Sequence, residues 1–206
     1  AWDLKGNKIV AKGRGTYITY YDESNKFQEG TVFNGNKTGN WTTFYRDGKV
    51  QETGVFNNDV YFLKSAWNDL GEIMVKDGNG EYLAYFETTP QIAKNGNYVN
   101  GLRDGNWLSY YPNSTQLQQE INYRAGKFSG RNVTYYSNGN ILTEGIFEND
   151  KRVGEWKWYY ESGQLQCTVK FKNGEKEGEQ IFWSESGRMA KKETYDQGKL
   201  VSEVLL

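Results

Sequence analysis

The side chains that could support acid–base or nucleophilic chemistry are few in this chain. None of the 206 residues is histidine, the commonest general base and metal ligand of proteins. The single cysteine, Cys167, alternates in phase with Leu165 and Val169 on the apolar side of a predicted strand. We therefore expect a buried, unreactive thiol at this position.

The carboxylates also argue against catalysis. Four glutamates recur on predicted strands of a repeating unit: Glu29, Glu52, Glu120 and Glu144. A pair of carboxylates can hydrolyse glycosidic bonds, but it needs one asymmetric pocket, whereas these residues recur at similar repeat positions. We interpret them as solvated strand residues. The stretch DGNG at 77–80 lacks the later acidic ligands of a calcium loop and predicts a turn. The sequence thus predicts no catalytic residue, no cofactor, no metal site and no enzyme activity.

Charge and hydropathy exclude further classes of function. The formal net charge is −1 and the charges are spread along the chain, so the sequence predicts no binding of nucleic acid and disfavours membrane lipid. No apolar run approaches the roughly 18 residues of a transmembrane helix. Because the sequence starts at Ala1 without methionine, we expect an exported protein, periplasmic or on the cell surface, whose leader was removed. A cytoplasmic location is the alternative.

The elements that position these side chains come from a repeat. Copies align on seven leading glycines, and abutting copies have a period of 24 or 25 residues. The leading glycines are Gly15, Gly39, Gly80, Gly105, Gly130, Gly154 and Gly178. A second similarity links the Trp- and Gly-containing segments that start at Trp2 and Trp67. We therefore predict a short array over 1–65 and a longer array over 66–206, which together form one continuous elongated body.

Each copy reads as two short strands around a glycine-containing turn, which is the pattern of a β-hairpin. A second glycine-containing loop leads directly to the next copy. We therefore predict an all-β fold, an extended antiparallel meander of stacked β-hairpin repeats with almost no helix. Along the second strand of a copy, Cys167, Val169 and Phe171 share one face, and Thr168 and Lys170 share the other.

Aromatic residues make up 16% of the chain and recur at fixed positions of the copy. Five residues after every leading glycine stands an aromatic side chain, and we expect these rings to stack between hairpins, because a lone hairpin is only marginally stable. The fifth-position residues are Tyr20, Phe44, Tyr85, Tyr110, Tyr135, Tyr159 and Trp183. Tyrosines at the sixth position, such as Tyr45 and Tyr136, we also interpret mainly as packing residues.

The tryptophans are less uniform, and we interpret them as half exposed on one face of the sheet. Trp41, Trp107 and Trp156 stand at position two, where the other copies have Tyr17, Tyr82, Asn132 and Gln180. Their exposure fits ordinary edge packing or a binding surface, and both interpretations stay open. The candidate binding surface is made of Trp41, Trp107, Trp156, Trp158, Tyr111 and Tyr160.

The pattern G-x-W-x-x-Y-Y-x-x-G-x-L followed by F/Y-x-x-G-x-x-x-G resembles the MORN repeat, and more closely its bacterial variant found in YwqK-like antitoxins. The segment GEWKWYYESGQLQCTVKFKNGEKEG, from Gly154, carries the resemblance most fully, and similar copies cover about three quarters of the chain. The resemblance implies an antiparallel β-sheet scaffold. It also implies an antitoxin role, in which the protein binds and neutralises a partner protein.

Two functions therefore compete. The first is a non-catalytic binding or scaffolding protein that recognises a protein partner, because Tyr and Trp are enriched in binding hot spots. The second is a cell-envelope or glycan-binding module, in which sugar rings stack on Trp41, Trp107, Trp156 or Trp158. The sequence predicts neither the identity of the partner nor the oligomeric state.

Overall fold

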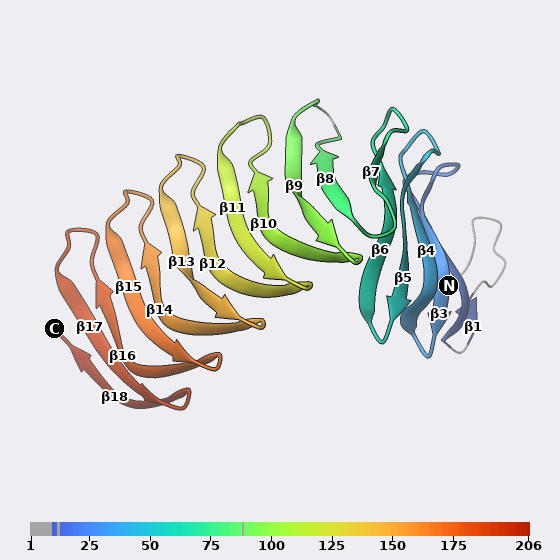
Figure 1. The fold of residues 1–206 in the computed structure, drawn as a ribbon. Coiled ribbons are helices and arrows are strands. Elements are labelled where there is room, and N and C mark those ends of the chain that lie inside the picture. Colours follow the sequence, from blue (N-terminus) through green and yellow to red (C-terminus); the bar gives the residue numbers. More distant parts are fainter. Residues whose placement is uncertain (1–9, 12, 88) are drawn as a thin grey trace. The chain divides into compact units, whose positions relative to one another are not determined.

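The computed structural model describes residues 10–11, 13–87 and 89–206. These residues form 18 β-strands and no helix, arranged in two sheets (Figure 1). In both sheets the strands follow one another in chain order, and each paired strand runs antiparallel to its neighbour. The prediction of an all-β meander of hairpin repeats is therefore confirmed.

The first sheet has seven strands in the order β1 to β7. Their bounds are β1 Val10–Ala11, β2 Arg14–Tyr20, β3 Lys26–Phe33, β4 Asn36–Phe44, β5 Val50–Asn57, β6 Val60–Trp67 and β7 Ile73–Val75. The second sheet has eleven strands in the order β8 to β18. Their bounds are β8 Gly80–Tyr85, β9 Ile92–Val99, β10 Leu102–Tyr110, β11 Leu117–Arg124, β12 Lys127–Tyr135, β13 Ile141–Glu148, β14 Lys151–Tyr159, β15 Leu165–Lys172, β16 Glu175–Trp183, β17 Met189–Asp196 and β18 Lys199–Leu205.

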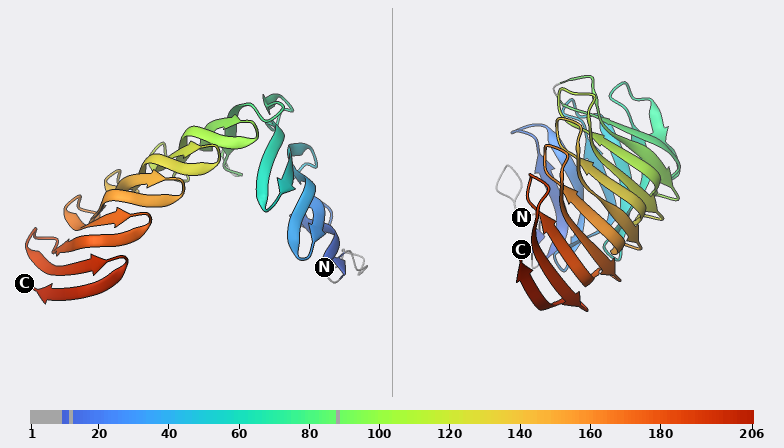
Figure 2. Two further views of the ribbon diagram at one scale, coloured as in Figure 1. Left: turned by 60° about the horizontal axis from the view of Figure 1, so that its bottom comes forward. Right: turned by 90° about the vertical axis from the view of Figure 1, so that its left-hand side faces the viewer.

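By its internal contacts the chain divides into two compact units. The first unit holds residues 1–84 and 97–103, and the second holds residues 85–96 and 104–206. The division into arrays over 1–65 and 66–206 stays a prediction, and part of the first Trp-containing segment lies outside the described residues. In the second unit, successive hairpins follow one another side by side, so each packs against the hairpin before it and the hairpin after it (Figure 2).

Two-residue turns close one end of the hairpins. In these turns both central residues have positive φ, as in Asn173–Gly174 with 54° and 91°, which is the geometry that matches the twist of paired strands. These turns also bond to the first strand of the preceding hairpin: the Gly174 N–H donates to the Arg152 carbonyl in β14 over 2.9 Å, and the Gly198 N–H donates to the Lys176 carbonyl in β16 over 2.9 Å. The turn chemistry thus links successive repeats as well as closing each one.

The leading glycine marks a bulge in the first strand of the copy. Between β3 and β4 the pair Thr31–Thr38 is followed by the pair Gly30–Trp41, so Gly39 and Asn40 have no partner in β3, although both pair with β5. Gly39 has a φ of 62°, and no atom lies within 4 Å of the place where its Cβ would stand. The glycine is therefore required by its backbone conformation and not by lack of space.

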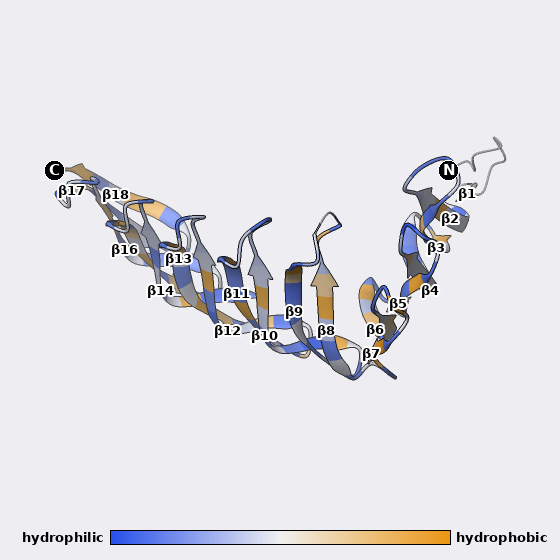
Figure 3. Ribbon diagram, turned by 90° about the horizontal axis from the view of Figure 1, so that it is seen from above, coloured by the Kyte–Doolittle hydropathy of each residue, from blue (hydrophilic) through white to orange (hydrophobic). Residues whose placement is uncertain are grey.

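The strands have two different faces, and hydrophobic and hydrophilic stretches alternate along them (Figure 3). In the second unit, the indole face is the one that carries Trp107, Trp156, Val169 and Phe171, of which Val169 is 1% exposed. The carboxylate face is the opposite one and carries Glu120 and Glu144. In the first unit, the core is formed by Leu63, Ala66 and Val75, with Tyr61 and Tyr82 packed against them.

Candidate functional site

The position-two tryptophans are buried, which corrects the expectation that they are half exposed. The side chains of Trp41, Trp107 and Trp156 are each 3% exposed. Trp158 is half-buried and contacts Trp156, with ring centroids 6.0 Å apart. Three of the four tryptophans in the predicted binding surface therefore have no free ring face for a partner or a sugar ring.

A glycine on the preceding strand explains this burial. A Cβ added to Gly145 would lie 2.2 Å from Cδ2 of Trp156, so the indole lies flat on the backbone where a side chain would otherwise stand. Gly30 under Trp41 and Gly96 under Trp107 show the same close approach, at 2.2 and 2.3 Å. In a sheet only one layer thick, an indole is thus buried by occupying the side-chain space of its cross-strand neighbour.

The two copies with an amide side chain at position two show the reverse arrangement. Asn132 replaces the tryptophan in β12 and pairs with Ile121, and Gln180 replaces it in β16 and pairs with Val169. On the preceding strand, glycine thus stands opposite tryptophan, whereas a branched apolar residue stands opposite Asn132 and Gln180. This complementary exchange is visible in the sequence, but it can be recognised only when the facing positions are known.

Cations cover the outer side of the same rings. The Arg152 guanidinium lies 4.7 Å from the ring centroid of Trp156, and the Lys37 ammonium lies 4.1 Å from that of Trp41. The Trp156 indole N–H donates to the Ile146 carbonyl over 3.1 Å. The indole is therefore fixed in place by three contacts: the glycine backbone lies against one ring face, a cationic side chain lies against the other, and the N–H is hydrogen-bonded.

The sixth-position tyrosines join successive repeats through their hydroxyl groups. Tyr111 donates to the Tyr135 carbonyl over 2.7 Å, and Tyr160 donates to the Trp183 carbonyl over 2.8 Å. The same bond runs from Tyr21 to Phe44, from Tyr45 to Trp67 and from Tyr136 to Tyr159. Two residues of the predicted binding surface, Tyr111 and Tyr160, therefore use their hydroxyls inside the fold.

The fifth-position aromatics do not stack as expected. Ring contacts in the described residues run along the indole face instead, from Tyr123 through Phe128 and Phe147 to Trp156. The fifth-position residue Tyr159 points to the other face, where its hydroxyl donates to Glu144 over 2.8 Å. The expectation was wrong because the fifth-position residues stand on the first strands of the copies, and a second strand lies between two successive first strands, as β13 does between β12 and β14.

The recurring glutamates are not simply solvated, which corrects a second interpretation. Glu144 is half-buried and accepts hydrogen bonds from Tyr159 over 2.8 Å and from Arg131 over 3.0 Å. Glu120 similarly accepts bonds from Asn106 and Tyr135, over 3.1 and 3.3 Å. Tyrosine–glutamate pairs thus recur along the carboxylate face of the second unit.

The network around Glu144 fixes its charge state. Partial burial raises the pKa of the Glu144 carboxyl, but the hydrogen bonds from Tyr159 and Arg131 and the Arg131 charge outweigh this, so its pKa lies below the ordinary value. Burial, followed by the bond to Glu144, raises the pKa of the Tyr159 phenol to about 12. At neutral pH the site holds an ionised carboxylate between a neutral phenol and a guanidinium.

Next to this network lies an exposed apolar side chain. Ile146 is 48% exposed and borders a shallow depression of about 240 Å³. The depression is lined by Arg131, Glu144, Gly145, Ile146, Glu155 and Lys157. Sequence reasoning missed this site, because an isoleucine in a strand is indistinguishable from a core residue until its face is known.

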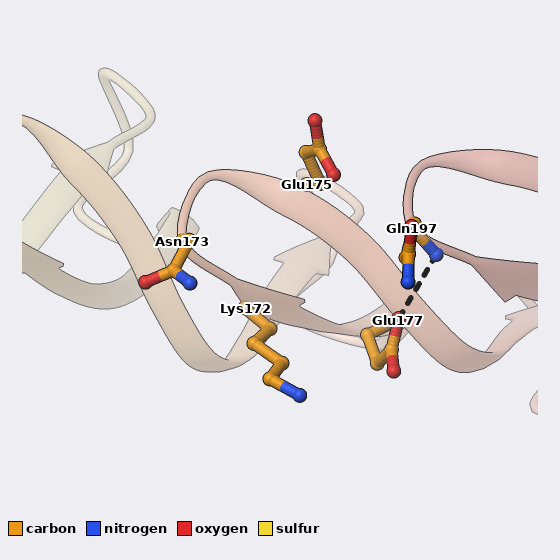
Figure 4. A pocket seen from close by; sticks show the side chains of 5 residues that line it. All are labelled: Lys172, Asn173, Glu175, Glu177 and Gln197. Atoms are coloured by element: carbon orange, nitrogen blue, oxygen red, sulfur yellow. Dashed lines mark hydrogen bonds between the residues drawn. The ribbon is translucent and has the colours of Figure 1, made fainter.

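A second depression, of about 220 Å³, lies at the turn end of the hairpins (Figure 4). Its Glu177 carboxylate accepts the backbone N–H of Gln197 over 3.0 Å and so links two successive hairpins. The side chains of Lys172 and Glu175 point in different directions in Figure 4. The arrangement supports turn stability and offers no converging pair of acids.

Other chemical groups of the described residues do not assemble into a site. Cys167 is buried as expected, and burial raises the pKa of its thiol. Within the described ranges no three His, Cys, Asp or Glu side chains lie close enough together to hold a metal ion. Over the same residues, the structure contains no helix with the length and apolarity required to cross a membrane.

Comparison with known proteins gives one family. Four stretches of the chain match the MORN repeat variant: residues 37–58, 129–149, 152–173 and 176–197. Together they cover less than half of the chain, and three of them are consecutive copies of the second unit. No curated protein matches the chain. The matches support a non-catalytic repeat protein of the kind that often binds partners.

Proposed function

We propose that the chain is a non-catalytic protein-recognition module whose partner binds the carboxylate face around Ile146. The observation that carries this proposal is the half-exposed Ile146 side chain surrounded by fixed charges of both signs. Protein interfaces typically combine an apolar centre with a polar rim, and a small number of central residues supply most of the binding energy.

The rim is held in place before any partner arrives. Arg131 and Tyr159 bond to the same carboxylate, that of Glu144, and Lys157 lies 3.4 Å from the carboxylate of Glu155. Side chains that are already ordered lose less conformational entropy on binding. The charges of both signs favour a partner surface with a complementary pattern over a uniformly charged polymer.

The finer functions implied by the sequence are also proposals. Neutralisation of a harmful partner is supported by the resemblance to antitoxins alone. Glycan binding would require accessible indole rings, and the burial of Trp41, Trp107 and Trp156 favours the carboxylate face and a protein partner instead.

The test is affinity purification from the native host with the intact chain and with Ile146→Asp as baits, followed by mass spectrometry. We expect at least one protein to be recovered with the native chain and to be reduced more than tenfold with the variant, as for a hot-spot residue.

The matched control is Ile73→Asp, because Ile73 is 50% exposed and lies in β7 of the first unit. Circular dichroism should show that both variants keep the β-sheet spectrum. Recovery of the same proteins by the native chain, Ile146→Asp and Ile73→Asp would contradict a recognition site at Ile146.

A further inference from the structure

An aromatic stripe crosses the carboxylate face of the second unit, beside the longer loops of the hairpins. Its rings are the half-buried fifth-position residues Tyr110, Tyr135, Tyr159 and Trp183, each of which stands at the bulge where its strand meets the next one. Aliphatic side chains of the second strands lie between the rings, as Leu165 does where it pairs with Tyr159. The aromatic stripe therefore runs across the strands from β10 to β16.

The polar atoms of the four rings fall into two groups. The hydroxyls of Tyr135 and Tyr159 donate to glutamates of the preceding strand, over 3.3 and 2.8 Å. Within the described residues, by contrast, no group hydrogen-bonds to the Tyr110 hydroxyl or to the Trp183 indole N–H. The aromatic stripe thus has two fixed rings in its middle and a free hydrogen-bond donor at each end.

A carboxylate without a cationic partner lies in β11, between the first two rings. The hydrogen-bond donors to this Glu120 carboxylate are Asn106 and Tyr135, both neutral, over 3.1 and 3.3 Å. No Lys or Arg of the described ranges forms an ion pair with Glu120. The corresponding Glu144 of the next copy is paired with Arg131 over 3.0 Å. A ligand that follows the aromatic stripe therefore meets an uncompensated negative charge at its β10–β12 end.

The spacing of the rings matches one class of peptide. Neighbouring strands lie about 4.8 Å apart, so rings two strands apart repeat about every 9.6 Å. A polyproline II helix has three residues per turn and rises about 3.1 Å per residue, which gives a repeat of about 9.3 Å. Two turns of an α-helix, of seven residues, span about 10.5 Å. Over the three repeats from Tyr110 to Trp183, a polyproline II helix stays in register within about 1 Å, whereas an α-helix drifts by about 3 Å.

We infer that the aromatic stripe binds a proline-rich segment of a protein partner in the polyproline II conformation, with one turn of the segment per ring and a basic residue beside Glu120. Such segments dock on aromatic-lined grooves, and they lose little entropy because their conformation is already formed. Their carbonyls have no internal hydrogen bonds and can accept from Tyr110 and Trp183. The inference rests on the proposed function, since it names a class of partner for the carboxylate face.

Fluorescence anisotropy with the intact chain and labelled proline peptides tests the inference. The six strand spacings from β10 to β16 span about 29 Å, which about nine residues in the polyproline II conformation cover. Affinity should therefore rise as the peptide is lengthened from about three to about nine prolines, and should change little from about nine to about twelve. A glycine–serine peptide of the same length as the longest proline peptide should not bind.

Variants at the two ends of the aromatic stripe test the hydrogen bonds while keeping a ring in place. Tyr110→Phe and Trp183→Phe should each weaken binding of the longest proline peptide by about fivefold, because each removes one donor. Tyr17→Phe, in β2 of the first unit, is the matched control and should leave the affinity unchanged. Trp183→Ala also removes the ring and should weaken binding by more than about tenfold.

The charge of the peptide tests its placement beside Glu120. Replacing the proline at one of the two peptide ends by arginine should strengthen binding, and Glu120→Gln should remove that gain. The inference would be overturned by a lack of binding at millimolar proline peptide, by an affinity that does not depend on Tyr110 and Trp183, or by no gain from arginine at either end.

The same assay separates the inference from the proposed function. Ile146→Asp should leave the affinity for the proline peptide unchanged, because Ile146 lies outside the aromatic stripe. If Ile146→Asp reduces the recovery of host proteins but no proline peptide binds the native chain, the inference fails and the proposed function stands. If the proline peptide binds as described but Ile146→Asp changes no recovery, the recognition site at Ile146 fails and the inference stands.

Discussion

The substitution Gly145→Ile should destabilise the native chain, but it should stabilise a chain in which Trp156 is replaced by asparagine. In the native chain, a Cβ at position 145 would stand 2.2 Å from the Trp156 ring. The ring cannot withdraw easily, because its N–H bonds to the Ile146 carbonyl and Arg152 lies against its other side. Overpacking of this kind costs about 1–3 kcal/mol of the free energy of unfolding.

In a chain that carries Trp156→Asn, the same isoleucine should stabilise. Removing the indole costs about 3–5 kcal/mol and leaves the space above Gly145 empty. Isoleucine at position 145 then recreates the natural pair Ile121–Asn132. Burial of the isoleucine side chain should raise the free energy of unfolding by roughly 1.5–3 kcal/mol. The two substitutions together should therefore be less damaging than Trp156→Asn alone.

Urea unfolding of the four proteins of this double-mutant cycle, followed by circular dichroism, measures the effect. The coupling free energy should be on the order of 3 kcal/mol, the upper end for residues in contact. Ile146→Val, at an exposed neighbouring position, is the control and should change stability by less than about 0.5 kcal/mol. Equal destabilisation by Gly145→Ile in both backgrounds would refute the pairing of glycine with tryptophan.

Three further predictions concern other features of the repeat. Tyr160→Phe removes the hydroxyl bond to the Trp183 carbonyl and should lower the free energy of unfolding by about 1 kcal/mol in urea titrations, whereas no change would contradict the hydroxyl ladder. Tyr159 should titrate at about pH 12 by ultraviolet absorbance. Because its folded pKa lies above the unfolded value of about 10, its contribution to stability is complete below pH 10 and is lost as the pH rises towards 12, a loss that Tyr159→Phe should remove. Gly105→Ala should lower the free energy of unfolding by about 1 kcal/mol. No atom lies within 4 Å of the added Cβ, so the effect comes only from the φ of 71° at this position. An unchanged thermal midpoint would contradict this prediction.

The hairpin architecture could be predicted from the sequence because its signals are local. Glycine-containing turns, strand length and the alternation of Cys167, Val169 and Phe171 each depend on neighbouring residues. The burial of Cys167 followed from the same alternation. Repetition of these local signals over seven copies then predicted the meander.

The candidate site could not be predicted because it depends on contacts between strands. Each first strand carries a bulge, so equal spacing from the leading glycine does not reveal which side chains face each other. The presence of Asn132 at a tryptophan position suggested an exposed slot, whereas Ile121 opposite it compensates for the smaller side chain. Ile146 and the charges around it become a site only when the opposite face is known to be closed by the indoles.

The closure of the indole face is the central claim, and hydrogen exchange of the indole N–H groups tests it most directly. Trp41 donates to the Thr31 and Thr38 carbonyls, both over 3.2 Å, and Trp156 donates to the Ile146 carbonyl. In nuclear magnetic resonance spectra, both indole protons should therefore exchange with solvent only when the sheet opens, at least a hundredfold more slowly than in the unfolded chain. Exchange of either proton at the unfolded rate in the folded protein would show an open indole face and contradict the claim.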